Sequence, residues 1–403
     1  MRHPFLIFRR FLFVLAGLAV SAVPAPAGER PDLPTIDLSA RSELQTVVAQ
    51  GTPEVYQGHP TSVLLPDGKT LIAVWSLGHG GFAGPMAESR DAGLSWTRID
   101  QRAPEGFRQH KNCPSIYRTV NKEGESFLWV FSAQPRMPRI LSRDGGKTWT
   151  ETEPLGLKCV MAFSSMIPKH PGKEDGCYLA FYHHRVSEDG TVFDTEPREP
   201  GRLETLVTET ADAGFTWSAP CVIASLPETK TAAPDGSVEV VPKRDPCEPC
   251  AFWSPGRDEI CVLLRENTHT DRSLVIFSRD GGQTWTEPRP TPWGLTGDRH
   301  AVLYLPDGRI FAAMRDVAPG SETLGHFVAW VGRYEDIKTG APGDFRLKLI
   351  HSYAGRDCGY PAVHLLADGT VLAMTYIKYD EGANKHSVVL VRIPPEIFAG
   401  EDR

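Results

Sequence analysis

The chain has 403 residues and a formal net charge of −7 at neutral pH. This length is enough for one large domain or two ordinary ones, and the acidic balance argues against nucleic-acid binding, which needs a basic face. Eight cysteines are compatible with disulfide bonds in an oxidising compartment, although the sequence does not determine their pairing.

The N-terminus has the pattern of a secretion signal. Three arginines precede an apolar run over residues 11–23, and small residues follow at positions 25–27. The apolar run is shorter than the roughly 20 residues that span a bilayer. An N-terminal membrane anchor is the alternative, but we expect residues 1–27 to be removed on export to the periplasm or the medium. Residues 28–403 would then carry no stable membrane anchor.

Residues 43–49 form the first strand candidate of the remaining chain. They precede a series of repeats and contain no copy of the repeated motif described below. If the repeats close into a ring, this strand can complete the last unit and remove its exposed edge.

An octapeptide with the pattern S/T-x-D-x-G-x-S/T-W recurs four times, each time after an apolar run. The Asp can accept hydrogen bonds from backbone N–H groups in a tight turn. The Gly permits a positive φ, and the Trp buries a large apolar surface. We therefore expect each copy to form a hairpin turn and its Asp to be structural rather than catalytic. The copies are Ser89–Trp96, Ser142–Trp149, Thr210–Trp217 and Ser278–Trp285.

A second repeated pattern indicates how many units the fold contains. Six segments each begin with a special residue, continue as a short apolar strand and a turn, and end with a second apolar strand that reaches a polar residue. These segments predict an all-β fold, a six-bladed β-propeller of four-stranded antiparallel sheets in one domain over residues 28–403. Residues 226–241 are predicted to be a surface loop rather than a domain boundary. The six segments are 59–75, 111–132, 160–182, 248–265, 299–315 and 360–376.

The octapeptides resemble the Asp box of sialidases and related β-propellers, and the similarity covers residues 50–395. In that family the boxes lie on the outer rim, a catalytic Glu opens a strand, an Arg ends the following strand, and a Tyr opens the last blade. Glu248, Arg265 and Tyr360 match these positions. The resemblance implies a secreted glycoside hydrolase of the exo-α-sialidase type.

The propeller fold predicts where the site lies. Innermost strands run beside the channel, so residues at their starts and at the ends of the following strands converge on one mouth. Tyr360 beside Glu248 would be a nucleophile with its base. Arginines among the residues at this mouth can bind a sugar that bears a carboxylate, either a sialic acid or a uronic acid. The predicted substrate contacts are Arg265, Arg299, Arg315, Lys111, Tyr376 and His183.

The first blade departs from the sialidase pattern. It carries Gly58-His59-Pro60 where the family has an Arg-x-Pro motif, and no acidic residue follows its second strand before Glu88. His59 and His79 can move a proton in place of the missing acid. We therefore expect the catalytic residues to be Tyr360, Glu248, His79 and His59.

No metal or cofactor is predicted. The pair Cys247 and Cys250 resembles half of a zinc site, but no second half accompanies it. Buried thiols or a disulfide bond are the alternatives for this pair.

Two other function classes remain open. One is a polysaccharide lyase or hydrolase acting on uronic acids, with Tyr360 or His59 moving the proton. The other is a non-catalytic glycan-binding propeller. An internal lattice of Glu–Arg ion pairs would also explain the charged residues without any ligand. In each functional reading the partner is a glycan or glycoconjugate with an acidic sugar.

Overall fold

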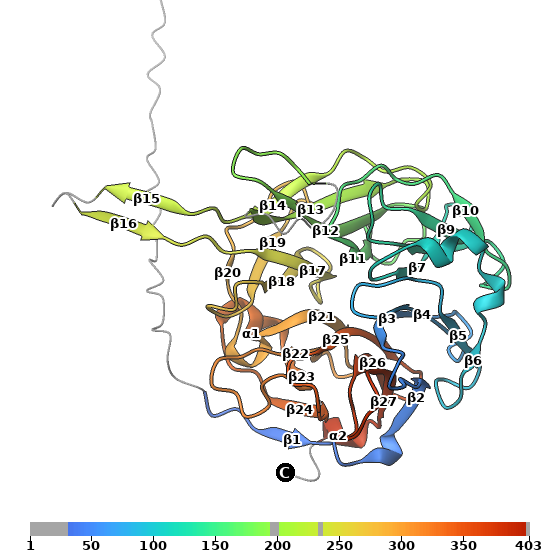
Figure 1. The fold of residues 1–403 in the computed structure, drawn as a ribbon. Helices are drawn as coiled ribbons and strands as arrows, with labels where there is room; N and C mark the ends of the chain where they lie inside the picture. Colours follow the sequence, from blue (N-terminus) through green and yellow to red (C-terminus); the bar gives the residue numbers. More distant parts are fainter. Residues whose placement is uncertain (1–30, 194–200, 233–236, 400–403) are drawn as a thin grey trace, which may run out of the picture.

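The computed structural model describes residues 31–193, 201–232 and 237–399. The predicted signal segment, residues 1–27, lies outside the described residues. Six antiparallel sheets surround a common centre (Figure 1), and each inner strand contacts the inner strands of the neighbouring blades around the ring. The predicted six-bladed β-propeller is confirmed.

Each blade runs from its inner strand outward in chain order. The strands of the first three blades are β3 (Gln57–Leu64), β4 (Leu71–Leu77), β5 (Met86–Ser89) and β6 (Thr97–Arg98); β7 (Ser115–Val120), β8 (Ser126–Phe131), β9 (Arg139–Ser142) and β10 (Thr150–Thr152); and β11 (Met161–Pro168), β12 (Tyr178–Val186), β13 (Arg202–Thr210) and β14 (Cys221–Ser225). The strands of the last three are β17 (Pro246–Trp253), β18 (Ile260–Glu266), β19 (Leu274–Ser278) and β20 (Arg289–Pro290); β21 (Gly297–Tyr304), β22 (Ile310–Asp316), β23 (Phe327–Gly332) and β24 (Phe345–Ile350); and β25 (Cys358–Leu365), β26 (Val371–Ile377) and β27 (Ser387–Ile393).

The N-terminal strand closes the ring. β2 (Gln45–Ala49) pairs antiparallel with β27, with Gln45 opposite Val391, and so supplies the outer strand of the last blade as predicted. A shorter strand, β1 (Thr35–Asp37), pairs parallel with β24 and covers the edge of the preceding blade. Both pairings remove exposed sheet edges.

The octapeptides form the predicted turns between the third and fourth strands of four blades. In the second copy, Asp144 Oδ1 accepts hydrogen bonds from the N–H groups of Lys147 and Thr148, both at 3.0 Å. Gly146 has a φ of 86°, and a Cβ there would approach Ile72 of the preceding blade to 2.2 Å. The motif therefore shapes the turn and permits close packing between blades.

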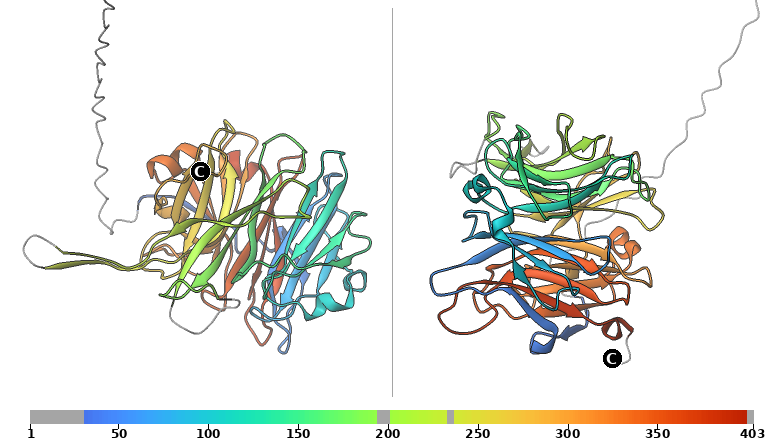
Figure 2. Two further views of the ribbon diagram at one scale, coloured as in Figure 1. Left: turned by 90° about the horizontal axis from the view of Figure 1, so that it is seen from above. Right: turned by 90° about the vertical axis from the view of Figure 1, so that its right-hand side faces the viewer.

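Residues 226–241 differ from the expected surface loop. They contain an antiparallel hairpin of β15 (Thr229–Ala232) and β16 (Val238–Val241), which projects from the disc between the third and fourth blades (Figures 1 and 2). β-Branched residues in both strands favour the extended conformation.

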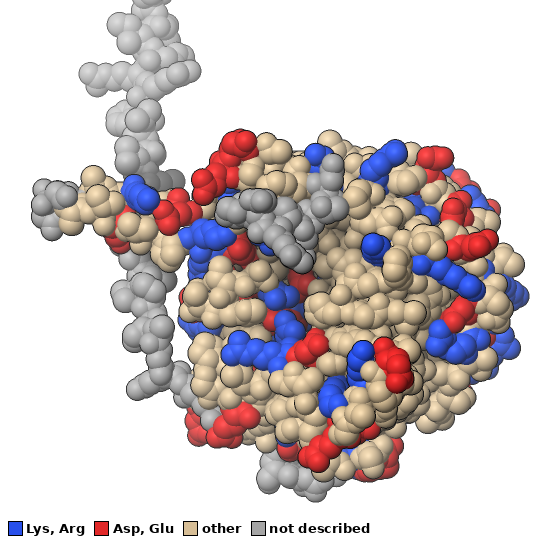
Figure 3. Space-filling model, viewed as in Figure 1, with Lys and Arg blue, Asp and Glu red and all other residues tan. Residues whose placement is uncertain are grey.

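Among the described residues, helical structure is confined to short segments. The α-helices are α1 (Tyr334–Thr339) and α2 (Glu396–Ala399), and the 3₁₀ turns are η1 (Ser42–Leu44), η2 (Asp100–Arg102), η3 (Glu105–Gln109) and η4 (Trp293–Leu295). Within the described ranges, no helix has the length and apolar character needed to cross a bilayer. Acidic and basic side chains are interspersed over the face shown in Figure 3, so this face presents no large field of one sign.

Candidate active site

Four inner strands carry the same backbone distortion at their third residue. The non-glycine residues there have positive φ, and a β-bulge shifts the register immediately afterwards. A positive φ at such residues costs on the order of 1 kcal/mol, and a bulge redirects a side chain. Strain repeated at equivalent positions marks them as candidates for function. The residues and their φ values are His59 (49°), Glu248 (46°), Arg299 (52°) and Tyr360 (53°).

A cavity of about 340 Å³ lies where these strands meet. It brings together six of the ten residues that were predicted to form the site. Asn112, Met161 and Asn267 are among the further lining residues, which the sequence analysis did not single out. The six predicted residues in the cavity wall are His59, His79, His183, Glu248, Arg265 and Tyr360.

Tyr360 and Glu248 form a buried hydrogen-bonded pair. The Tyr360 hydroxyl donates to Glu248 Oε1, and Arg265 Nη1 donates to Oε2 at 3.0 Å. Burial alone would raise the pKa of Glu248, but Arg265 and Arg299 outweigh it and lower this pKa to about 2. Burial and the Glu248 carboxylate raise the pKa of Tyr360 well above its usual value. A neutral phenol thus faces an ionised carboxylate, the arrangement of a nucleophile with its base.

Arg299 and Arg315 do not join Arg265 in the cavity wall. The guanidinium carbon of Arg299 lies 4.9 Å from the ring centroid of Tyr360, and its Nη1 donates to Ser164 Oγ at 2.8 Å. Arg315 Nη1 donates to the carbonyl oxygen of Arg356 at 2.6 Å. Of the three arginines predicted to contact the substrate, only Arg265 lines this cavity.

Asp298 was missed in the sequence analysis, and its carboxylate balances the charge of two of these arginines. Its Oδ1 lies 3.1 Å from Arg265 Nε, and its Oδ2 accepts a hydrogen bond from Arg315 Nε at 3.0 Å. Burial opposes ionisation, but Arg265 and Arg315 lower the pKa of Asp298 well below its usual value. The Asp298 carboxylate thus neutralises part of the positive charge that the sequence assigned to binding an anionic ligand. Glu248 and Asp298 link the arginines into part of the ion-pair lattice that was considered as an alternative.

Two buried histidines are neutral. Gly80 N–H donates to His59 Nδ1 at 3.2 Å, and Glu248 N–H donates to His183 Nδ1 at 3.3 Å. Burial lowers the pKa of each imidazole to about 3. Since Nδ1 accepts a hydrogen bond in each, the ring proton is on Nε2. His59 Nε2 is buried and has no hydrogen-bond partner among the described residues, so it can donate to a ligand.

His79 lies at the exposed side of the cavity beside a second missed carboxylate. Asp357 Oδ1 is 3.4 Å from His79 Nδ1 and accepts hydrogen bonds from Tyr56 at 2.9 Å and Tyr376 at 3.1 Å. The pKa of Asp357 is well below its usual value, because hydrogen bonds and the nearby His79 and His386 outweigh burial. Tyr376, a predicted substrate contact, therefore anchors Asp357 and does not line the cavity.

Lys111 is also outside this cavity. It lines a neighbouring one, with Nζ 4.9 Å from the ring centroid of Phe82. Asp298 stands one residue before Arg299, and Asp357 stands three residues before Tyr360. The run of polar residues preceding each bulge was the available sequence signal for both carboxylates.

The cysteine pair on β17 belongs to no group of three possible metal ligands among the described residues. Cys247 and Cys250 are both buried thiols. Burial raises the pKa of Cys250 to about 12 and that of Cys247 well above its usual value, so both are neutral thiols in this structure. A different group of possible metal ligands, His170, Asp175 and Cys177, lies outside the cavity wall.

Buried histidines make the folded state sensitive to acid. An unfolded chain protonates them near pH 6.5, whereas the folded chain resists protonation until the lower folded pKa is reached, so the unfolded state binds more protons in between. We expect the free energy of unfolding to fall as pH decreases from 6.5 to 4, by up to roughly 1.4 kcal/mol per pH unit for each such group. Urea unfolding across this range measures the slope, and a flat profile would contradict the expectation. The groups are His59 and His183, with a pKa of about 3, and His110 and His364, with a pKa of about 4.

Comparisons with known proteins agree with this architecture. The family model of the BNR/Asp-box repeat matches residues 276–287, and no curated protein matches the sequence. A protein of unknown function from Dyadobacter fermentans superposes with a TM-score of 0.61 at 16% identity, over 87% of this chain and 98% of that chain. The α-L-arabinofuranosidase Arb93A of Fusarium graminearum gives a TM-score of 0.55 at 12% identity, over 86% and 97%.

A sialidase of Trypanosoma rangeli superposes with a TM-score of 0.49 at 14% identity, over 86% of this chain and 56% of that chain. The two superpositions with the higher TM-scores cover 87% and 86% of this chain. The match to the BNR/Asp-box model contains the fourth copy of the octapeptide. The chain is therefore a six-bladed β-propeller that carries Asp-box repeats.

Proposed function

We propose that the protein is a glycoside hydrolase that removes a terminal sugar from a glycan, with Tyr360 as the nucleophile. The observation that carries this proposal is the hydrogen bond from the Tyr360 hydroxyl to Glu248 in the wall of the cavity. Both residues occupy backbone positions with positive φ. A purely structural pair would not require two such strained positions.

In the first step, Tyr360 Oη attacks the anomeric carbon while the glycosidic C–O bond breaks. Glu248 takes the phenolic proton, and the leaving-group oxygen takes a proton from an acid in the site. In the second step, water attacks the same carbon, the bond to Tyr360 breaks, and Glu248 returns its proton to the phenolate. Arg265 and Arg299 stabilise the negative charge that passes between the two residues.

His79 is the proposed acid and base for the leaving group. It lines the cavity, and Asp357 faces its Nδ1, which leaves Nε2 for proton transfer. In its charged form His79 gives this proton to the departing oxygen, and it then accepts one from the attacking water. His59 is neutral and contributes its Nε2–H as a hydrogen-bond donor to the sugar.

We propose an acidic terminal sugar, such as a sialic acid, as the substrate class. Tyr360 is a neutral nucleophile, which avoids repulsion with an anionic sugar, and Arg265 supplies a guanidinium in the cavity wall. Residues 1–27 are proposed to direct the protein out of the cell, where such glycans are exposed.

A neutral sugar is the second candidate, and Asp298 favours it. Because Asp298 already pairs with Arg265 and Arg315, less positive charge is left to bind a substrate carboxylate. The Fusarium graminearum enzyme of similar fold is an α-L-arabinofuranosidase, although a shared fold does not by itself transfer an activity.

A panel of chromogenic glycosides tests the proposal and separates the two sugar classes. We expect release of the chromophore from a sialoside or a uronide, whereas release only from an arabinofuranoside would favour the neutral-sugar candidate. A rise in ultraviolet absorbance on polyuronates would instead reveal a lyase. Glycan binding without any bond cleavage would overturn the hydrolase and leave a binding propeller.

A further inference from the structure

Three cavities form a row that leads away from Tyr360. The catalytic cavity shares Gly80, Asn112 and Val160 with a second cavity of about 390 Å³. The second cavity shares Gln109 with a third, of about 430 Å³. Each volume lies within the roughly 300–1,000 Å³ range of small-molecule sites. Shared wall residues make the row continuous with the catalytic site.

Backbone hydrogen bonds fix the wall between these cavities. Phe82 forms antiparallel bridges with both Leu77 and Lys111. Asn112 N–H donates to the carbonyl oxygen of Gly81 at 2.9 Å, and Ala83 N–H donates to that of His110 at 2.8 Å. The segment between β4 and β5 is thereby joined to the segment between η3 and β7. The row is preformed, which reduces the entropy lost when a ligand binds.

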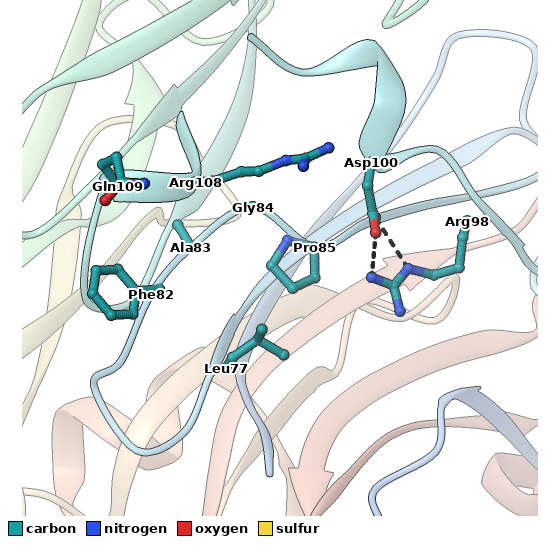
Figure 4. A pocket seen from close by; sticks show the side chains of 9 residues that line it. All are labelled: Leu77, Phe82, Ala83, Gly84, Pro85, Arg98, Asp100, Arg108 and Gln109. Atoms are coloured by element: carbon teal, nitrogen blue, oxygen red, sulfur yellow. Dashed lines mark hydrogen bonds and ion pairs between the residues drawn. The ribbon is translucent and has the colours of Figure 1, made fainter. Parts of the chain in front are cut away.

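The third cavity combines apolar and hydrogen-bonding groups (Figure 4). The side chains of Phe82, Leu77 and Pro85 lie along one side, and Arg108 extends along the other. Phe82 is 46% exposed and Leu77 is 43% exposed, so they form a contiguous apolar surface. Exposed apolar side chains rimmed by polar groups are typical of binding grooves.

The polar groups along the row are available to a ligand. Arg108 makes no ion pair or side-chain hydrogen bond within the described ranges. Lys111 Nζ lies over the Phe82 ring, and Gln134 Oε1 accepts the Lys111 N–H at 2.8 Å, which leaves the amide NH₂ of Gln134 as a donor. An aromatic face, amide groups and cations together match the apolar C–H face and the hydroxyls of successive sugar rings.

We propose that this row binds an oligosaccharide, with the sugar to be cleaved in the catalytic cavity, the next beside Asn112 and Gln134, and a third packed against the exposed side chains of Phe82 and Leu77. The inference rests on the proposed function and narrows its substrate to chains of three or more sugars. It also assigns a place to Lys111, which lies outside the catalytic cavity yet contacts the proposed chain.

The variant Phe82→Ala tests this site kinetically. The comparison uses one chromogenic single-sugar glycoside and one oligosaccharide of at least three sugars with the same terminal residue. We expect the ratio of kcat/KM for the oligosaccharide to kcat/KM for the glycoside to fall about 10-fold, and Phe82→Trp to restore it. Leu94→Ala, at an exposed apolar residue of the first octapeptide, is the matched control and should leave the ratio unchanged. An unchanged ratio in Phe82→Ala would overturn the proposal.

Binding to the Tyr360→Phe protein distinguishes this inference from the proposed hydrolase. Calorimetry with sialyl-lactose, oligogalacturonides and arabino-oligosaccharides measures affinity independently of turnover. An affinity that falls about 10-fold when Phe82→Ala is added supports the groove, even if the parent protein cleaves none of these chains. Binding that is insensitive to Phe82, or no binding to any of the three, would refute it.

Discussion

The Tyr360→Phe variant is expected to lose glycoside hydrolysis by roughly 10⁴-fold or more in kcat, because it removes the atom that attacks the anomeric carbon. The phenyl ring keeps its contact with the Arg299 guanidinium, so substrate affinity should change much less. Initial rates and calorimetric binding on the same protein preparation measure the two effects separately.

Tyr304→Phe is the matched control for this experiment. Its hydroxyl donates to the carbonyl oxygen of Trp253 at 2.8 Å in another blade, away from the cavity wall. Loss of this hydroxyl should cost about 1 kcal/mol of stability and leave the rate constant unchanged. Near-normal turnover in Tyr360→Phe would remove Tyr360 from the chemistry and with it the proposed mechanism.

The Asp298→Asn variant is expected to lower the free energy of unfolding by about 3–5 kcal/mol. Asp298 is 2% exposed, and its carboxylate faces Arg265, Arg315 and His269. A neutral amide leaves the two guanidinium groups buried without their shared counter-charge. Equilibrium unfolding in urea at neutral pH measures the loss.

Two further variants isolate the cause of that loss. Adding Arg315→Met to Asp298→Asn removes one uncompensated charge and should restore part of the stability. Asp67→Asn, in an exposed turn where Asp67 accepts the Thr70 N–H at 2.8 Å, should cost less than about 1 kcal/mol. A loss as small as this in Asp298→Asn would contradict the assigned role of the carboxylate.

The six blades could be predicted from sequence because each consists of local strand pairs and turns. The same holds for Glu248, Arg265 and Tyr360, whose places are fixed by the start of an inner strand or the end of the next one. Even the closing strand was predictable, since residues 43–49 lacked a repeat of their own and the last blade lacked an outer strand. Local patterns were sufficient to place these three residues at the ends of their strands.

The contacts of the side chains at the bulge of β21 could not be predicted. A shift of one residue moves a side chain to the other face of a sheet, and the register shift between Asp298 and Ala301 was not apparent from the sequence. It places Asp298 between Arg265 and Arg315 and sends Arg299 beneath the Tyr360 ring. Likewise, Asp357 meets His79 only because the ring brings the last blade beside the first.

The closing pair of strands also bears on how the chain reaches its native state. Gly51, just after β2, donates its N–H to Ser387 Oγ, a residue 336 positions later. β2 can therefore pair with β27 only after nearly all of the chain has been synthesised. Contacts of such high sequence separation also slow folding. Until this pairing forms, the outer edge of the last sheet, at β27, is open, so assembly of the ring is a late event in maturation.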